Sequence, residues 1–117
     1  MVAWCYLPNL VAALSRAEAI AKIRALAEAG CVSMQKRAQV RMEDLGYNVH
    51  DVEDCLCGLR EDECTKDSAP QHPEFGDGAW VYEFVTDFFG EPPLYVKVYL
   101  YPDSVYVLSF KIDGSPA

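Results

Sequence analysis

The sequence lacks any apolar run long enough to cross a membrane. No segment of the 117 residues reaches the ~18–20 consecutive apolar residues that a membrane-spanning helix needs. The stretch from Met1 to Leu14 has no basic residue ahead of its apolar part, so it does not have the form of a secretory signal. These absences predict a cytoplasmic protein with no membrane partner.

The sequence also lacks a regular cysteine pattern. Its cysteines are odd in number and irregularly spaced, and without an export signal they predict reduced thiols: Cys5, Cys31, Cys55, Cys57 and Cys64. A zinc site would have to draw on His50, Cys55, Cys57, Cys64 and His72. One residue, rather than the usual two, separates Cys55 from Cys57, and core packing is the alternative for cysteine. We expect neither a metal nor another cofactor.

A nucleophilic cysteine is a weaker alternative. Cys64 and His72 are the one plausible pair, and three acidic residues directly precede Cys64. Because nearby carboxylates raise the pKa of a thiol, they oppose formation of the reactive thiolate.

Basic residues are scarce and unevenly distributed. The formal net charge is −8, which argues against indiscriminate nucleic-acid binding. Residues 1–41 carry six basic and two acidic side chains, a net of +4, whereas residues 42–117 carry four basic and sixteen acidic ones, a net of −12. An anionic ligand would therefore need locally placed lysines or the first third of the chain.

Helical signals fill the first half of the chain. Ser15 and Glu18 form a capping box, Gly30 supplies a left-handed stop, and Asn48 can cap a further helix. The spacing predicts a short helical turn over 8–14 and helices over about 17–29, 33–45 and 49–57.

After Gly58 the hydrophobic period changes from helical to alternating. In Leu94–Tyr101, the even-numbered aliphatic residues share one face, and Tyr95, Lys97, Tyr99 and Tyr101 share the other. Further strands are predicted over 61–66, 80–89 and 104–111, with a loop over 68–78. We expect a single α+β domain in which N-terminal helices (about 8–58) pack on a curved antiparallel β-sheet (about 61–112).

The strand residues suggest a chemistry. Cleavage of RNA by its own 2′-hydroxyl needs a proton acceptor, a proton donor and cations around the phosphate, and it needs no metal. Lys66, Lys97 and Lys111 are the only basic residues after Arg60, and all three fall on predicted strands, with Tyr95 on the same face as Lys97. The alternative is that strand lysines protect sheet edges and tyrosines fill the rim of the core.

Short anchors recur in a fixed order from Ile20 to Lys111. They are Ala29-Gly30-Cys31-Val32, Asp44-Leu45-Gly46, Gly58-Leu59 with Glu61 and Lys66, Trp80 with Phe84, Tyr95-Val96-Lys97, and Val107-Leu108-Ser109-Phe110-Lys111. In this order the chain resembles the MqsR-type toxins of bacterial toxin–antitoxin pairs. The resemblance implies a RelE-like fold whose open sheet face cuts mRNA without a metal. It also implies an antitoxin partner of helix-turn-helix type, encoded next to the gene.

The resemblance assigns roles to particular residues. The family's catalytic positions fall at Lys66, Tyr95 and Lys111, and Lys97 matches a less clearly catalytic lysine. The family's glutamine after the strand tryptophan is here Val81, and Glu83 follows on the same face, where it could act as a base or repel phosphate.

The acidic balance leaves two functions open. RNA affinity depends on lysine and arginine, so the net charge after residue 41 should weaken it. The basic residues of the second predicted helix, Lys36, Arg37 and Arg41, could track an RNA backbone or form a solvated helix face. We therefore expect an endoribonuclease toxin. The alternative is a catalytically weakened or inactive binding module of the same fold that acts as a protein-interaction, immunity or regulatory partner, and a zinc-binding or unrelated small domain is the remainder.

Overall fold

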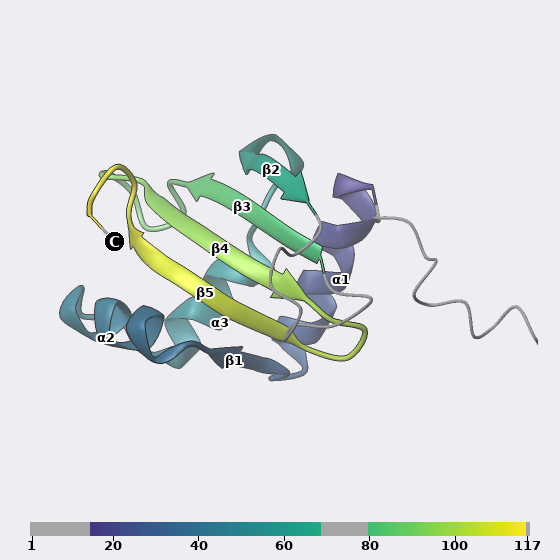
Figure 1. The fold of residues 1–117 in the computed structure, drawn as a ribbon, viewed down its shortest axis with the longest axis horizontal. Helices are drawn as coiled ribbons and strands as arrows, with labels where there is room; N and C mark the ends of the chain where they lie inside the picture. Colours follow the sequence, from purple (N-terminus) through teal and green to yellow (C-terminus); the bar gives the residue numbers. More distant parts are fainter. Residues whose placement is uncertain (1–14, 69–79, 117) are drawn as a thin grey trace, which may run out of the picture.

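The computed structural model describes residues 15–68 and 80–116 and confirms the α+β class (Figure 1). The elements in chain order are α1 (Arg16–Glu28), β1 (Val32–Met34), α2 (Lys36–Asp44), α3 (Val49–Cys57), a 3-10 turn η3 (Glu61–Glu63), β2 (Cys64–Ser68), β3 (Trp80–Thr86), β4 (Leu94–Leu100) and β5 (Val105–Ile112). The turn predicted over 8–14 and residues 69–78 of the predicted loop lie outside the described residues. Within the described ranges, no helix combines the length and apolar character that crossing a membrane requires.

The five strands form one sheet in the order β1-β5-β4-β3-β2. The ladders from β2 to β5 are antiparallel, as predicted, but β1 pairs in parallel with β5, so the sheet is mixed. The second helix was predicted to begin near Ser33 and begins at Lys36 instead. The residues before it are extended because they pair with β5, and the Gln35 N–H donates to the Val107 carbonyl at 2.9 Å.

The predicted helix caps are confirmed. The Ser15 hydroxyl accepts the Glu18 N–H at 3.2 Å, and the Glu18 carboxylate accepts the Ser15 N–H at 3.0 Å. Asn48 and Asp51 form the same reciprocal pair, at 3.0 and 2.8 Å. Gly30 follows α1 with a φ of +77°, a left-handed conformation that glycine adopts without a Cβ penalty.

Two predicted strand boundaries are wrong. Residues Glu61–Glu63 form a 3-10 turn, and the strand begins only at Cys64. Strand β3 was predicted to continue to Phe89 but ends at Thr86, whose hydroxyl accepts the Phe88 N–H at 3.1 Å. The Gly90 N–H then closes the turn on the Asp87 carbonyl at 2.7 Å.

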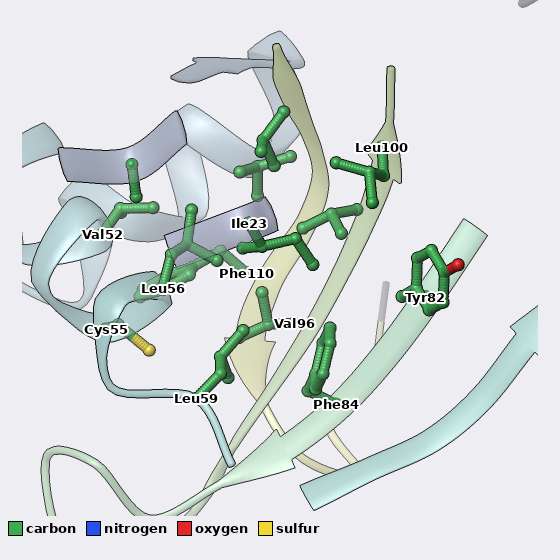
Figure 2. Packing of buried hydrophobic residues seen from close by; sticks show 14 of the residues in the cluster. Ile23, Val52, Cys55, Leu56, Leu59, Tyr82, Phe84, Val96, Leu100 and Phe110 are labelled. Atoms are coloured by element: carbon green, nitrogen blue, oxygen red, sulfur yellow. The ribbon is translucent and has the colours of Figure 1, made fainter. Parts of the chain in front are cut away.

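The helices cover one face of the sheet and form the core there (Figure 2). Ile23 of α1 and Leu56 of α3 are fully buried against strand residues that include Phe84, Val96 and Phe110 (Figure 2). The aliphatic face predicted for 94–100 is part of this core. We call the opposite face of the sheet the open face.

A buried carboxylate ties η3 to the end of β3. Glu63 is 6% exposed, and its side chain accepts the Arg60 N–H at 2.9 Å and the Thr86 hydroxyl at 2.8 Å. The Arg60 guanidinium lies 3.4 Å from the same carboxylate. Because Thr86 is itself buried, losing Glu63 would leave its hydroxyl without this acceptor.

We therefore expect Glu63→Ala to lower the free energy of unfolding by about 2 kcal/mol, the usual cost of leaving a buried polar group unpaired. Asp62→Ala is the matched control, because Asp62 also contacts Arg60 but its side chain is 74% exposed. It should change stability by less than about 0.5 kcal/mol. Urea unfolding measures both, and equal losses in the two variants would contradict this role for Glu63.

Candidate functional site

A β-bulge directs Lys66 to the open face. Cys64 pairs with Phe84 and faces the core, whereas Lys66 pairs with Glu83, so Thr65 is the extra residue between two register positions. Strict alternation would have placed Lys66 on the same face as Cys64. The bulge reverses this, as bulges beside functional sites often do.

A second bulge does the same for Lys111. Lys97 pairs with Ser109 but the next residue, Val98, pairs with Val107, which leaves Leu108 as the extra residue in β5. Val107 faces the core, and without the bulge Lys111 would follow it there. With the bulge, Lys111 lies on the open face directly opposite Tyr95.

The sheet therefore brings the predicted strand residues together on one face. Across the strands the register aligns Lys66, Glu83, Lys97 and Ser109 in one row, and the neighbouring row contains Val85, Tyr95 and Lys111. We call the five titratable residues the open-face site: Lys66, Glu83, Tyr95, Lys97 and Lys111. Ser109 was not among the predicted site residues, although it lies in the same row as Lys66, Glu83 and Lys97.

Glu83 is at the centre of the open-face site. The Tyr95 hydroxyl donates to Glu83 Oε1 at 2.9 Å, and Lys66 Nζ lies 4.0 Å from Glu83 Oε2. The Glu83 side chain is 18% exposed, against 60% for Lys66. A partly shielded carboxylate that accepts a hydrogen bond from a phenol can serve as a proton acceptor in acid–base chemistry.

Tyr95 is held in its protonated form. Burial, followed by the hydrogen bond and the negative charge of Glu83, raises the pKa of the Tyr95 phenol above its ordinary value of 10.0. A phenol with a raised pKa keeps its proton at neutral pH, so Tyr95 can donate it to a substrate oxygen. Glu83 and Tyr95 thus form an acceptor–donor pair.

Lys111 borders Tyr95 on the β5 side. Its Nζ lies 5.5 Å from the centre of the Tyr95 ring, within the range of a cation–π contact, and donates to the Ser115 carbonyl at 2.7 Å. With Lys66 on the β2 side, the Glu83–Tyr95 pair has a cation on each flank.

The other end of the open face is closed. Tyr99 is 4% exposed and Val81, its register partner, is 5% exposed. Tyr99 is therefore a buried member of the tyrosine face, and Tyr101 lies beyond the end of β4.

The three basic residues of α2 lie at different ends of the helix. Lys36 and Arg37 are exposed in its first turn, whereas Arg41 lies in its last turn beside β5. Arg41 and Lys111 line the same small pocket, and the Arg41 guanidinium donates to the Pro116 carbonyl at 2.6 Å. Of the three, Arg41 is the residue that the fold places next to the open-face site.

Two of the described cysteines, Cys55 and Cys64, are buried in the core. Cys55 lies in the core, where burial and then the charge of Glu63 raise the pKa of its thiol to about 12. Burial also raises the pKa of Cys64. Among the described residues, no three His, Cys, Asp or Glu side chains come together as a metal-binding group, and His72 lies outside them. Core packing is thus confirmed for Cys55.

Comparisons with known proteins add no family to this picture, because no family model matches the sequence and no curated protein matches it significantly. Function is therefore inferred from the open-face site itself.

Proposed function

We propose that the protein is a metal-independent endoribonuclease. The observation that carries this proposal is the Tyr95–Glu83 hydrogen bond of 2.9 Å, flanked by Lys66 and Lys111 on one sheet face. This arrangement holds a proton acceptor, a proton donor and two cations, the groups that intramolecular attack on an RNA phosphate requires.

The reaction follows from these positions. Glu83 takes the proton of the RNA 2′-hydroxyl as its oxygen attacks the adjacent phosphorus. The bond from phosphorus to the 5′-oxygen breaks, and Tyr95 protonates that leaving oxygen, which yields a 2′,3′-cyclic phosphate and a 5′-hydroxyl. Lys66 and Lys111 stabilise the charge that develops on the phosphoryl oxygens.

The Tyr95–Glu83 contact also resets the site. After cleavage Glu83 carries the proton from the 2′-hydroxyl, and Tyr95 is a phenolate. Because the two groups lie in hydrogen-bonding distance, Glu83 can return its proton to Tyr95 directly. The raised pKa of Tyr95 favours this transfer and restores both residues to their starting forms.

The biological role in this proposal is that of an MqsR-type toxin with a RelE-like fold, acting on mRNA and neutralised by an antitoxin. It is supported by the resemblance of the anchors from Ile20 to Lys111. The product of a neighbouring gene, co-expressed with this chain, should then form a stable complex with it and suppress RNA cleavage.

The direct test uses the purified protein and a single-stranded RNA in the presence of EDTA. We expect cleavage products with 2′,3′-cyclic phosphate and 5′-hydroxyl ends, detected by mass spectrometry, and no cleavage where every ribose carries a 2′-O-methyl group. Because only a few lysines and arginines contact the RNA phosphates in this proposal, the rate should fall only modestly as salt rises. Intact RNA at every salt concentration would reject the enzyme.

One observation favours a second function. Glu83 is already paired with Tyr95 and Lys66, so the centre of the site presents a carboxylate rather than a free cation. Such a face suits a binding module for a basic protein surface. A stable protein complex together with the absence of RNA cleavage would identify this function.

A further inference from the structure

A short strap follows β5 and turns back toward α2. We define the strap as residues 114–116. Gly114 has a φ of +83°, and both the N–H and the hydroxyl of Ser115 donate to the Ile112 carbonyl, at 3.0 and 2.6 Å. These bonds fold the strap into a tight turn that carries the carbonyl groups of Ser115 and Pro116 over the end of the sheet.

The two strap carbonyls are bound by two cations from different elements. Lys111 Nζ on β5 donates to the Ser115 carbonyl at 2.7 Å, and the Arg41 guanidinium on α2 donates to the Pro116 carbonyl at 2.6 Å. Lengths of this kind are typical of charge-assisted hydrogen bonds. Lys111, which contacts the Tyr95 ring, thus binds one strap carbonyl, and Arg41, 75 residues before Pro116 in the chain, binds the other.

The cations and the strap border one pocket. It is lined by Arg41, Asp44, Leu45, Lys111, Ile112 and Ser115. A neutral carbonyl is a weaker partner for ammonium and guanidinium groups than a phosphate, which offers several charged oxygens and suits the planar fork of arginine. Asp44 is the one carboxylate among these lining residues, and its negative charge offsets part of the positive charge of Arg41 and Lys111.

We propose that this pocket is a phosphate-binding subsite, in which the strap carbonyls occupy the positions of phosphate oxygens and compete with the ligand. Resting on the proposed function, the ligand is the RNA phosphate next to the scissile one, and the RNA backbone leaves the open-face site toward α2 past Arg41. Opening of the strap releases Lys111 and Arg41 together, so the strap restrains both binding and cleavage.

The subsite can be tested without RNA by titrating the full chain with inorganic phosphate and following backbone amides by NMR. We expect shifts at residues 111–115 and 41–45. Ser115→Pro removes both donors to the Ile112 carbonyl, so the strap should open more often. If the strap of the unmodified chain is closed about nine-tenths of the time, the apparent Kd for phosphate should fall about tenfold in this variant. Ser115→Ala removes only the hydroxyl and should give an intermediate decrease.

Three further variants complete the experiment. Arg37→Gln removes an exposed arginine of the same helix that does not line the pocket, and it should bind phosphate as the unmodified chain does. Arg41→Gln should lose most of the binding, and Asp44→Asn should strengthen it by removing the opposing charge.

Equal affinities in the unmodified chain and both Ser115 variants would overturn competition by the strap. Unchanged binding in Arg41→Gln, or phosphate-induced shifts elsewhere only, would overturn the subsite. If phosphate binds as expected but RNA is never cleaved, the subsite stands and the endoribonuclease fails.

Discussion

Glu83→Gln is expected to reduce RNA cleavage by about a hundred- to ten-thousandfold, the usual contribution of a positioned general base. The glutamine side chain has nearly the shape of glutamate, and its carbonyl oxygen can still accept the Tyr95 hydroxyl. The site should therefore keep its structure and lose only the group that takes the 2′-hydroxyl proton. The loss should fall on kcat, because Glu83 acts in the transition state rather than in RNA binding.

The sign of this result decides between the two roles open to Glu83. If the carboxylate only repelled phosphate, Glu83→Gln would bind RNA more tightly and cleave it no more slowly. Glu28→Gln is the matched control, because Glu28 is an exposed residue at the end of α1, far along the chain from the open-face site, and its variant should cleave normally. Single-turnover rates with a short RNA, together with KM values, separate these outcomes.

Lys66→Ala and Lys111→Ala are each expected to lower cleavage by about a hundred- to a thousandfold, the cost of removing one group that stabilises the charge of a transition state. The two lysines flank the Glu83–Tyr95 pair from opposite strands, so neither can replace the other. The proposed toxin role predicts that expression of the protein alone arrests growth and that either substitution relieves this arrest.

Lys36→Ala supplies the comparison for both lysine variants. Lys36 is an exposed lysine in the first turn of α2 and has the same charge, but it lies outside the open-face site. Its loss should raise KM a few-fold at low salt and leave kcat unchanged, because it removes only a long-range attraction. Losses in the Lys66 and Lys111 variants no larger than this would contradict a role for either lysine at the scissile phosphate.

The parts of the fold that the sequence predicted correctly depend on local interactions. The capping boxes at Ser15 and Asn48 join residues three positions apart, so short-range spacing is sufficient to recognise them. The alternation from Leu94 to Leu100 indicated which face of β4 enters the core. It was sufficient because the ladder between β3 and β4 contains no bulge.

The wrong predictions concern pairing between distant segments. Residues 32–34 have no helix-breaking residue, and they are extended because β5, about seventy positions later, offers them a ladder. This outcome cannot be deduced from spacing, because it depends on which segments meet in the tertiary structure.

Local periodicity and side-chain type are sufficient to predict the α+β class, the helix caps and the candidate residues for phosphate chemistry. That Lys66 and Lys111 share a face with Glu83 and Tyr95 follows instead from pairing between strands. A side chain changes face with every one-residue shift in register, and the extra residues Thr65 and Leu108 produce that shift through pairing with β3 and β4. The register across the sheet, rather than the pattern within any strand, assembles the site.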